Sequence, residues 1–223
     1  MFIEVLLVMK RRLVLWLFLA MLVERVCAEP RHFLIQLNTS NRFELHVFKT
    51  GLYQGKFHTL LFPDYRGAAE YDPQRPETSR IELTLVTKAI KCVDTWLSTK
   101  DLKSVQEYAI HNMLAADQYP EMHFISSEVY PLGPNHFDVR GTLTIRGIAR
   151  PSSVDVTLQQ ESEKALIFRG TASVRLNDYG LKPPKALLGT IGTKNEMEFS
   201  FILEAEIAAL PIRAAQQQPG KAI

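Results

Sequence analysis

The sequence is poor in cysteine: only Cys27 and Cys92 occur among its 223 residues. Cys27 falls within residues 1–28, which have the pattern of a cleaved export signal, so one cysteine remains for the folded part and no internal disulfide is expected. Cys92 lies in an apolar run typical of a strand. We interpret it as a buried, inert thiol, because a reactive or metal-binding cysteine needs neighbours that stabilise the thiolate.

The sequence also lacks an excess of either charge. It has 26 basic and 24 acidic residues. Residues 1–28 hold four basic and two acidic residues, which leaves 22 of each sign in the rest of the chain. Nucleic acids are bound mainly through clustered Lys and Arg side chains on phosphates. The neutral remainder therefore gives no indication of a nucleic-acid-binding protein.

The signatures of common enzymes and cofactor sites are missing. The sequence contains no Gly-x-Ser-x-Gly, no His-Glu-x-x-His, no phosphate-binding glycine loop and no Cys-x-x-Cys. No two of its six histidines stand two residues apart, the spacing at which one strand presents both to a metal ion. We therefore predict a protein that is not an enzyme, with no catalytic residues, no metal site and no cofactor.

Residues 1–28 have the pattern of an export signal. A basic cluster at residues 10–12 precedes an unbroken apolar run at residues 13–23, and a Val-Cys-Ala sequence at residues 26–28 suits a signal peptidase. The apolar run is well short of the ~20 residues needed to span a bilayer. We predict cleavage, a periplasmic or secreted location and no stable membrane insertion; whether Met9 is the true start stays open.

Alternating apolar and polar residues recur along the rest of the chain and predict strands with one dry and one wet face. Phe137 and Val139, for example, flank Asp138. A single solvated face indicates an antiparallel sheet, and many such strands must close into a barrel or stack as a sandwich. The eight or nine segments lie near residues 33–38, 42–49, 57–72, 79–91, 122–130, 136–147, 153–161, 166–176 and 196–207.

One segment, residues 101–116, changes to a helical spacing of its apolar residues. Ser104 and Glu107 have the spacing of a capping box. We predict a single amphipathic helix that packs across one end or seam of the barrel. Residues 208–223 are rich in Ala, Gln and Pro and are predicted to form a flexible tail, which leaves one domain over residues 29–207.

The dry faces of the strands are candidates for the lining of a ligand cavity. The interior of an eight-stranded barrel is either just filled by side chains or just wide enough for one small ligand. Pockets and filled cores use the same apolar and aromatic side chains, so composition leaves both open. The residues predicted to line a cavity are Phe43, Leu45, Leu83, Leu85, Phe124, Phe137, Val139, Phe168, Phe199 and Phe201.

Four stretches resemble motifs of the YceI-like family of exported bacterial proteins. Their order and spacing also match, over about residues 33–207. The stretches are GTLTIRGIARP at residues 141–151, ADQYPEMHFISS at 116–127, RLNDYGL at 175–181, and Tyr71-Asp72-Pro73 followed by SRIEL at 79–83.

The resemblance implies an all-β fold. Its eight antiparallel strands would form an elongated, lipocalin-like barrel with an apolar tunnel and one packed helix. Members are associated with polyisoprenoids, isoprenoid quinones or fatty-acid-like amphiphiles, usually in the periplasm. We expect this chain to bind such a ligand as a carrier or buffer outside the cytoplasm. Where many members carry Arg-Asp or His-rich patterns, this chain keeps only Asp101 and His58, which are the candidate polar ligand contacts.

Two alternatives stay open. An enzyme could hold an apolar substrate in the same cavity, with His58, Asp101 or Asp178 as the reacting group. An interaction module could bind through exposed strand edges, although closure of a barrel removes such edges. The partner expected is the lipid or isoprenoid ligand, with no nucleic acid, and a homodimer stays open.

Overall fold

The computed structural model describes residues 30–208. The predicted export signal, residues 1–28, lies outside the described residues, as does the predicted tail beyond residue 208. No helix within the described part combines the length and the apolarity needed to cross a membrane.

Strands dominate the described part of the chain and join in one sheet. They are β1 (Arg31–Ile35), β2 (Arg42–Gly51), β3 (Phe57–Leu61), β4 (Tyr65–Tyr71), β5 (Arg80–Val86), β6 (Lys91–Cys92), β7 (Glu121–Gly133), β8 (His136–Ile145), β9 (Ile148–Glu161), β10 (Ala165–Arg175), β11 (Lys185–Ala186) and β12 (Ile191–Ile207). The helical elements are the α-helix α2 (Thr99–Glu107), the π-helical turn η3 (Tyr108–Met113), and the short turns η1 (Pro76–Thr78), η2 (Thr87–Ala89), η4 (Leu176–Tyr179) and η5 (Leu187–Gly189). The helix predicted over residues 101–116 is therefore present, as an α-helix continued by a π-turn.

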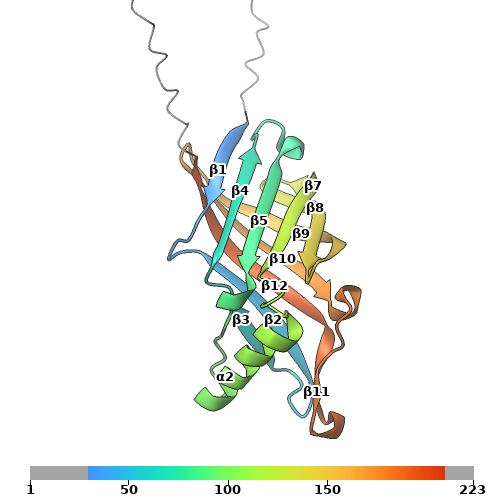
Figure 1. The fold of residues 1–223 in the computed structure, drawn as a ribbon. Coiled ribbons are helices and arrows are strands. Elements are labelled where there is room, and N and C mark those ends of the chain that lie inside the picture. Colours follow the sequence, from blue (N-terminus) through green and yellow to red (C-terminus); the bar gives the residue numbers. More distant parts are fainter. Residues whose placement is uncertain (1–29, 209–223) are drawn as a thin grey trace, which may run out of the picture.

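Eight strands close into the predicted antiparallel barrel, in the order β1-β4-β5-β7-β8-β9-β10-β12. The closing contact pairs β12 with β1, where Phe33 stands opposite Ile207 and Leu34 opposite Glu206. Figure 1 shows the barrel as an elongated body with α2 at one end. The predicted fold class is confirmed.

Strand β12 is long enough, at 17 residues, to serve both the barrel and a side sheet. One of its edges pairs with β10 along most of its length. Its other edge pairs with β2 over residues 191–202 and with β1 only at its C-terminal end. The strands β2, β3 and β6 therefore leave the barrel wall as a side sheet next to α2 (Figure 1).

The prediction of one strand over residues 57–72 is wrong, because the segment forms two strands with different partners. β3 pairs with β2 and β6, whereas β4 pairs with β1 and β5. The break falls at Phe62-Pro63-Asp64. Pro63 has no N–H to donate to a ladder and restricts the residue before it, so a strand that needs partners on both sides ends there.

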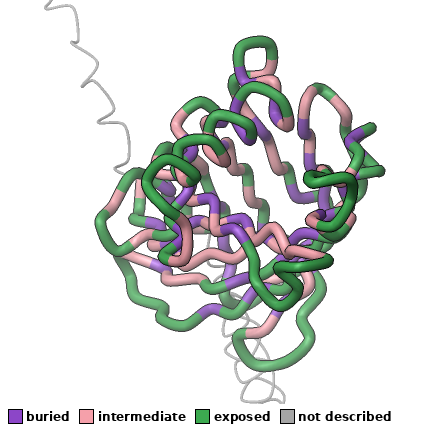
Figure 2. Tube along the Cα trace, turned by 90° about the horizontal axis from the view of Figure 1, so that it is seen from below, coloured by how far each residue is buried: buried purple, intermediate pink, exposed green. Residues whose placement is uncertain are grey.

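The alternation in the sequence becomes the two faces of the barrel wall. In β8, Val139, Leu143 and Ile145 are buried. Arg140 and Thr142 on the same strand are exposed. Viewed from the end that carries α2, buried and half-buried positions alternate with exposed ones along the wall (Figure 2). The inward positions are apolar because successive side chains of a strand point to opposite faces.

The start of the helix differs from the predicted capping box. Ser98 is the N-cap: its Oγ accepts a hydrogen bond from Asp101 N (3.2 Å) and donates one to the Asp101 carboxylate (2.7 Å). The predicted box of Ser104 and Glu107 does not form. Ser104 lies within the helix, so its hydroxyl bonds back to the Lys100 carbonyl oxygen (3.0 Å).

Candidate functional site

The barrel interior holds two apolar cavities. The wide cavity has a volume of about 350 Å³ and the narrow cavity one of about 80 Å³. Met122 on β7 and Phe199 on β12 line both of them. The two spaces are therefore neighbours along the interior, separated where these two side chains lie.

The wide cavity lies at the end where the side sheet, the helix and the barrel meet. Its wall combines β2 and β3, the helical segment α2–η3, η4, and the β11–β12 hairpin. The residues are Leu45, Val47, Lys49, His58, Leu60, Ser104, Val105, Tyr108, Ala109, Met113, Leu114, Met122, Ile145, Leu176, Tyr179, Leu181, Pro184, Lys185, Ala186, Ile191, Gly192, Thr193, Met197 and Phe199.

The narrow cavity continues the interior between the barrel strands. Its lining is aliphatic and aromatic apart from His123 and Ser152. Phe43 and Phe201 stack there, with ring centroids 5.4 Å apart and an interplanar angle of 5°. Such a lining offers a ligand contact area and few hydrogen-bonding groups.

Three polar residues of the wide cavity lie on the adjacent strands β2, β3 and β12, while Ser104, Lys185 and two tyrosines border it elsewhere. Lys49 on β2 stands directly opposite Thr193 on β12, and His58 on β3 stands opposite Val47 of β2. The Thr193 hydroxyl is buried and has no hydrogen-bond partner among the described residues. Burial lowers the pKa of Lys49, and the nearby charge of Asp94 partly opposes that effect. We call Lys49, His58 and Thr193 the polar wall.

His58 is held in place from the side away from the cavity. Its Nδ1 lies 2.6 Å from Oδ2 of the buried Asp94, whose Oδ1 accepts a hydrogen bond from Thr59 N (2.7 Å). The Trp96 ring stacks on the imidazole, with centroids 5.4 Å apart. Burial lowers the pKa of His58 more than the bond to Asp94 raises it, and Lys49 lowers it further. A neutral imidazole with a proton on Nδ1 leaves Nε2 as a hydrogen-bond acceptor.

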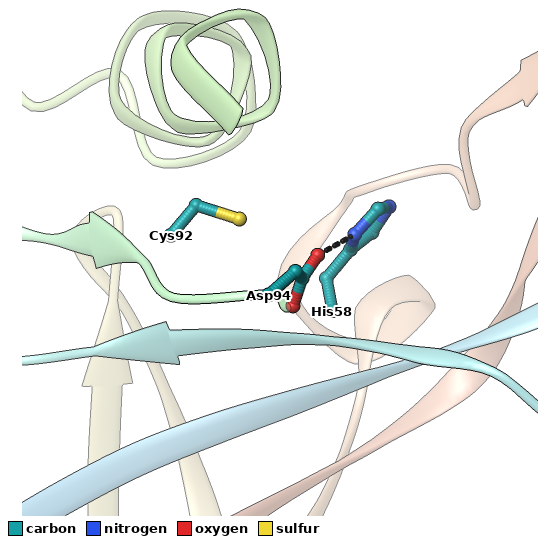
Figure 3. A group of neighbouring side chains, drawn as sticks. All are labelled: His58, Cys92 and Asp94. Carbon is teal, nitrogen blue, oxygen red and sulfur yellow. Dashed lines mark hydrogen bonds and ion pairs between the residues drawn. The ribbon is translucent and has the colours of Figure 1, made fainter. Parts of the chain in front are cut away.

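Cys92 completes a cluster with this pair. Ligand atoms of His58, Cys92 and Asp94 all lie within 4.8 Å of one another, and the Cys92 sulfur points toward the other two (Figure 3). Burial raises the pKa of the Cys92 thiol to about 11. The group is therefore a thiol at neutral pH, in line with the predicted buried cysteine and not with a nucleophile activated as a thiolate.

The barrel and its cavities fit the comparison with known proteins. The family model described as YceI-like domain matches residues 35–205. The chain belongs to the YceI-like family. The UPF0312 protein of Pseudomonas savastanoi pv. phaseolicola is 30% identical over 145 residues, which are 63% of this chain and 70% of that protein. The UPF0312 protein of Pseudomonas putida W619 is 29% identical over 58% of this chain and 67% of its own length.

Solved structures share this YceI-like fold. BcnA of Burkholderia cenocepacia superposes with a TM-score of 0.62 at 19% identity, over 76% of this chain and 98% of that one. A polyisoprenoid-binding domain from Saccharophagus degradans gives a TM-score of 0.55 at 12% identity, over 80% of this chain and 99% of that one. At these identities the likeness concerns the fold.

Most residues predicted to line a cavity lie at one. Eight of the ten apolar residues border the narrow cavity: Phe43, Leu83, Leu85, Phe124, Val139, Phe168, Phe199 and Phe201. Leu45 borders the wide cavity, together with Phe199. Phe137 is buried but borders neither, because it pairs with Pro131 near the β7–β8 hairpin.

The two predicted polar contacts of the YceI-like chain are far from equivalent. His58 borders the wide cavity, whereas Asp101 is exposed at the start of α2 and borders neither cavity. Asp178, a candidate reacting group of the enzyme alternative, is exposed in η4 and borders neither cavity. Only His58 of these three residues can touch a ligand in the interior.

Sequence reasoning missed the helical side of the wide cavity. Val105, Tyr108 and Met113 line it, and they belong to the apolar face that predicted the helix. That periodicity shows that the face is turned away from solvent, but not whether it packs against a strand or lines a cavity. Lys49 and Thr193 were missed because neither residue is unusual until the β2–β12 register places them side by side.

Proposed function

We propose that this protein binds a long-chain amphiphile with an apolar tail, such as a polyisoprenoid, an isoprenoid quinone or a fatty-acid-like molecule, inside its barrel. The observation that carries the proposal is the pair of adjoining apolar cavities. The wide cavity falls in the range of about 300–1,000 Å³ that is typical of ligand pockets. Family membership and the polyisoprenoid-binding relative in fold support the same class of ligand.

The shape of the lining favours an extended ligand. Along β12, lining positions run from Ile191 in the wide cavity to Leu203 in the narrow one. At ~3.3 Å per residue this stretch covers roughly 35–40 Å, which suits an alkyl or prenyl chain better than a compact ring system. Burial of apolar ligand surface contributes ~25 cal/mol per Å², from which the entropy of association is subtracted.

The polar wall gives the ligand a direction. We place the head group in the wide cavity, beside Lys49, His58 and Thr193, and the tail past Met122 in the narrow cavity. Lys49 and the Thr193 hydroxyl can donate hydrogen bonds, and the neutral His58 can accept one. A quinone, a prenol or a carboxylate each uses part of this set, whereas a pure hydrocarbon leaves it unpaired.

We further propose that the protein works as a carrier or buffer in the periplasm or after secretion. The pattern of residues 1–28 and the association of the family with exported proteins support this location. No catalytic step is proposed, because binding alone accounts for an apolar interior with one polar wall.

The decisive experiment is extraction. Protein purified without detergent is analysed by native mass spectrometry, and the released material by lipid mass spectrometry. We expect one bound amphiphile per chain. Emptied protein should gain thermal stability with quinones, prenols or fatty acids and not with short alcohols. A protein that carries no lipid and gains no stability from any of these would contradict the proposal.

A further inference from the structure

The cluster of His58, Cys92 and Asp94 arises from the register of the side sheet. β3 and β6 pair so that Cys92 stands opposite Leu60. Because the two strands are antiparallel, Asp94, two residues after Cys92, reaches His58, two residues before Leu60, on the same face. The chain after β6 continues the ladder, since Val93 N donates to the Thr59 carbonyl oxygen (3.0 Å). Three buried donors of different chemistry thus meet on one face of a short sheet.

We propose that His58 Nδ1, Cys92 Sγ and an Asp94 carboxylate oxygen form a binding site for a zinc-like divalent cation. Imidazole nitrogen, thiolate sulfur and carboxylate oxygen are the ligands that Zn²⁺ takes in proteins. One thiolate and one carboxylate together balance the charge of a divalent ion. Three protein ligands leave a fourth position for water or for a polar group of a bound molecule.

Neighbouring groups orient these ligand side chains, as the outer-sphere contacts of known metal sites do. Thr59 N fixes the second oxygen of Asp94, and the Trp96 ring holds the plane of the imidazole. Such contacts orient the ligands before the ion arrives. The pair Nδ1 and Oδ2, now 2.6 Å apart, must open slightly to admit an ion bound at about 2.0–2.3 Å from each ligand atom.

Binding has a defined proton balance. The Cys92 thiol loses its proton as the sulfur–metal bond forms. The proton on His58 Nδ1 moves to Nε2, so the imidazole stays neutral. One proton is therefore released for each ion bound. Ions held adventitiously by exposed histidines and carboxylates release no thiol proton.

The test uses the full chain with Cys27→Ser, which leaves Cys92 as its only thiol. Chelator-treated protein is titrated with Zn²⁺ by calorimetry in two buffers of different ionisation enthalpy. We expect one equivalent bound and one proton released. Co²⁺ should give the near-ultraviolet charge-transfer band of a cobalt thiolate. Saturation without proton release, or no saturation at one equivalent, overturns the proposal.

Substitutions distinguish an ion bound at the cluster from an ion bound by exposed side chains. Cys92→Ser and Asp94→Asn should each weaken binding at least a hundredfold, and Cys92→Ser should also abolish the proton release. His136→Gln, which removes an exposed histidine paired with Asp155, should leave the affinity and the proton release unchanged. Circular dichroism checks the fold; if Asp94→Asn unfolds, Cys92→Ser carries the test. Unaltered affinity in Cys92→Ser contradicts the site. Neither Cys92 nor Asp94 lines a cavity, so lipid binding should persist in Cys92→Ser.

A second observation concerns two neighbouring loops at the rim of the wide cavity. Leu52, Leu187 and Leu188 are exposed, with Leu188 fully so. Leu52 N donates to the Thr190 carbonyl oxygen (3.0 Å), which ties the β2–β3 loop to the β11–β12 loop. Leu187 and Leu188 both have positive φ, of 47° and 55°, a conformation unusual for leucine. We call these loops, residues 49–57 and 181–195, the apolar tip.

The charge of the apolar tip is of one sign. The two segments contain five lysines, Lys49, Lys56, Lys182, Lys185 and Lys194, and no Asp or Glu. The remainder of residues 29–223 holds 17 basic and 22 acidic residues, so this concentration of positive charge is local. Exposed leucines surrounded by lysines suit a bilayer surface, where apolar side chains enter between acyl chains and cations meet anionic head groups.

We infer that the apolar tip docks on an anionic lipid bilayer. The inference rests on the proposed lipid-binding function, because residues 184–186 and 191–193 of the same hairpin line the wide cavity. Docking would place the cavity rim at the membrane, where a lipid can pass between bilayer and barrel without crossing water.

Vesicle sedimentation with emptied protein tests the docking by itself. We expect binding to phosphatidylglycerol vesicles at low salt, and at least fivefold less to phosphatidylcholine vesicles. Leu187→Ser/Leu188→Ser should lower the binding at least fivefold. Leu132→Ser, at an exposed leucine of the β7–β8 hairpin, is the matched control. Equal loss in both variants, or no vesicle binding, overturns the docking, while lipid extraction judges the proposed function separately.

Discussion

Met122 and Phe199 are the only described residues that line both cavities, so they mark the passage between the wide and the narrow space. Met122 is 1% exposed and Phe199 4%. Methionine is unbranched and adapts its shape readily. The length of ligand that the barrel accepts therefore depends on how these two side chains arrange themselves.

Met122→Ala should widen this passage. The empty protein loses roughly 2–5 kcal/mol of stability from the lost burial and the larger cavity. Ligand preference should shift toward longer chains, measured by native mass spectrometry with prenols of graded length. Met113→Ala, at a half-buried residue that lines only the wide cavity, is the control. An unchanged length preference would show that Met122 does not separate the two spaces.

Val139→Trp should fill much of the narrow cavity, because Val139 is 2% exposed and lines only that space. We expect long prenols to lose affinity at least tenfold while short ones keep it, as followed by competition with a fluorescent fatty acid. Thr142→Trp puts the same ring on the exposed face of β8 and should leave binding unchanged. Equal loss for all chain lengths would indicate unfolding, which thermal melts detect.

Lys49→Met tests the polar wall while it keeps an unbranched side chain in place. Affinity for a fatty acid should fall about tenfold, which corresponds to about 1.4 kcal/mol. Affinity for a hydrocarbon of the same length should not change, since it has no head group to bind. Lys91→Met, on the exposed side of β6, is the control. A hydrocarbon affinity that falls in parallel would mean that Lys49 acts on the shape of the cavity.

Burial of Tyr179 should make the stability of the folded protein fall at alkaline pH. Burial raises the pKa of its phenol to about 12, above the value near 10 of an unfolded chain. The folded state therefore keeps its proton longer, and its stability falls between pH 10 and 12. Over this window wild type should lose about 2–3 kcal/mol relative to Tyr179→Phe, measured by urea unfolding. Tyr53→Phe, in an exposed loop, is the control, and two parallel pH curves would contradict the assignment.

Ser98→Ala should remove the cap of α2 and destabilise the protein by about 1 kcal/mol, because Asp101 N loses its partner. Ser104→Ala lies within the helix and should change stability by less than half of that, since its hydroxyl only bonds back to the preceding turn. Thermal unfolding of the two variants compares them directly. A larger effect at Ser104 would restore the capping box predicted from its spacing with Glu107.

The features of this fold that can be predicted are those determined by residues close together in the sequence. The alternation in β8 decides which residues face inward, so Phe137 and Val139 could be assigned to the interior before their neighbours were known. The apolar spacing of residues 101–116 likewise decides that a helix forms. Its first residue was misplaced because Ser98 and Asp101, like Ser104 and Glu107, satisfy the spacing of a cap.

The features that cannot be predicted from sequence patterns depend on the register between strands that are far apart in the chain. Pro63 divides two strands whose partners are β2 and β6 on one side and β1 and β5 on the other, and no local pattern distinguishes those partners. Cys92 and His58 meet because Cys92 pairs opposite Leu60. A shift of the β3–β6 register by two residues would separate the side chains of Cys92 and His58 by more than the rise of one strand residue.

The contact of Phe33 with Ile207 joins the first described strand to the last. Because these residues are 174 positions apart in the sequence, their meeting carries a high entropy of loop closure and belongs among the slow steps of folding. Until Ile207 has been synthesised and delivered to β1, the interior remains an open trough. Pairing of β12 with β1 closes this trough, so a hydrophobic chain can then enter the interior only from an end of the barrel.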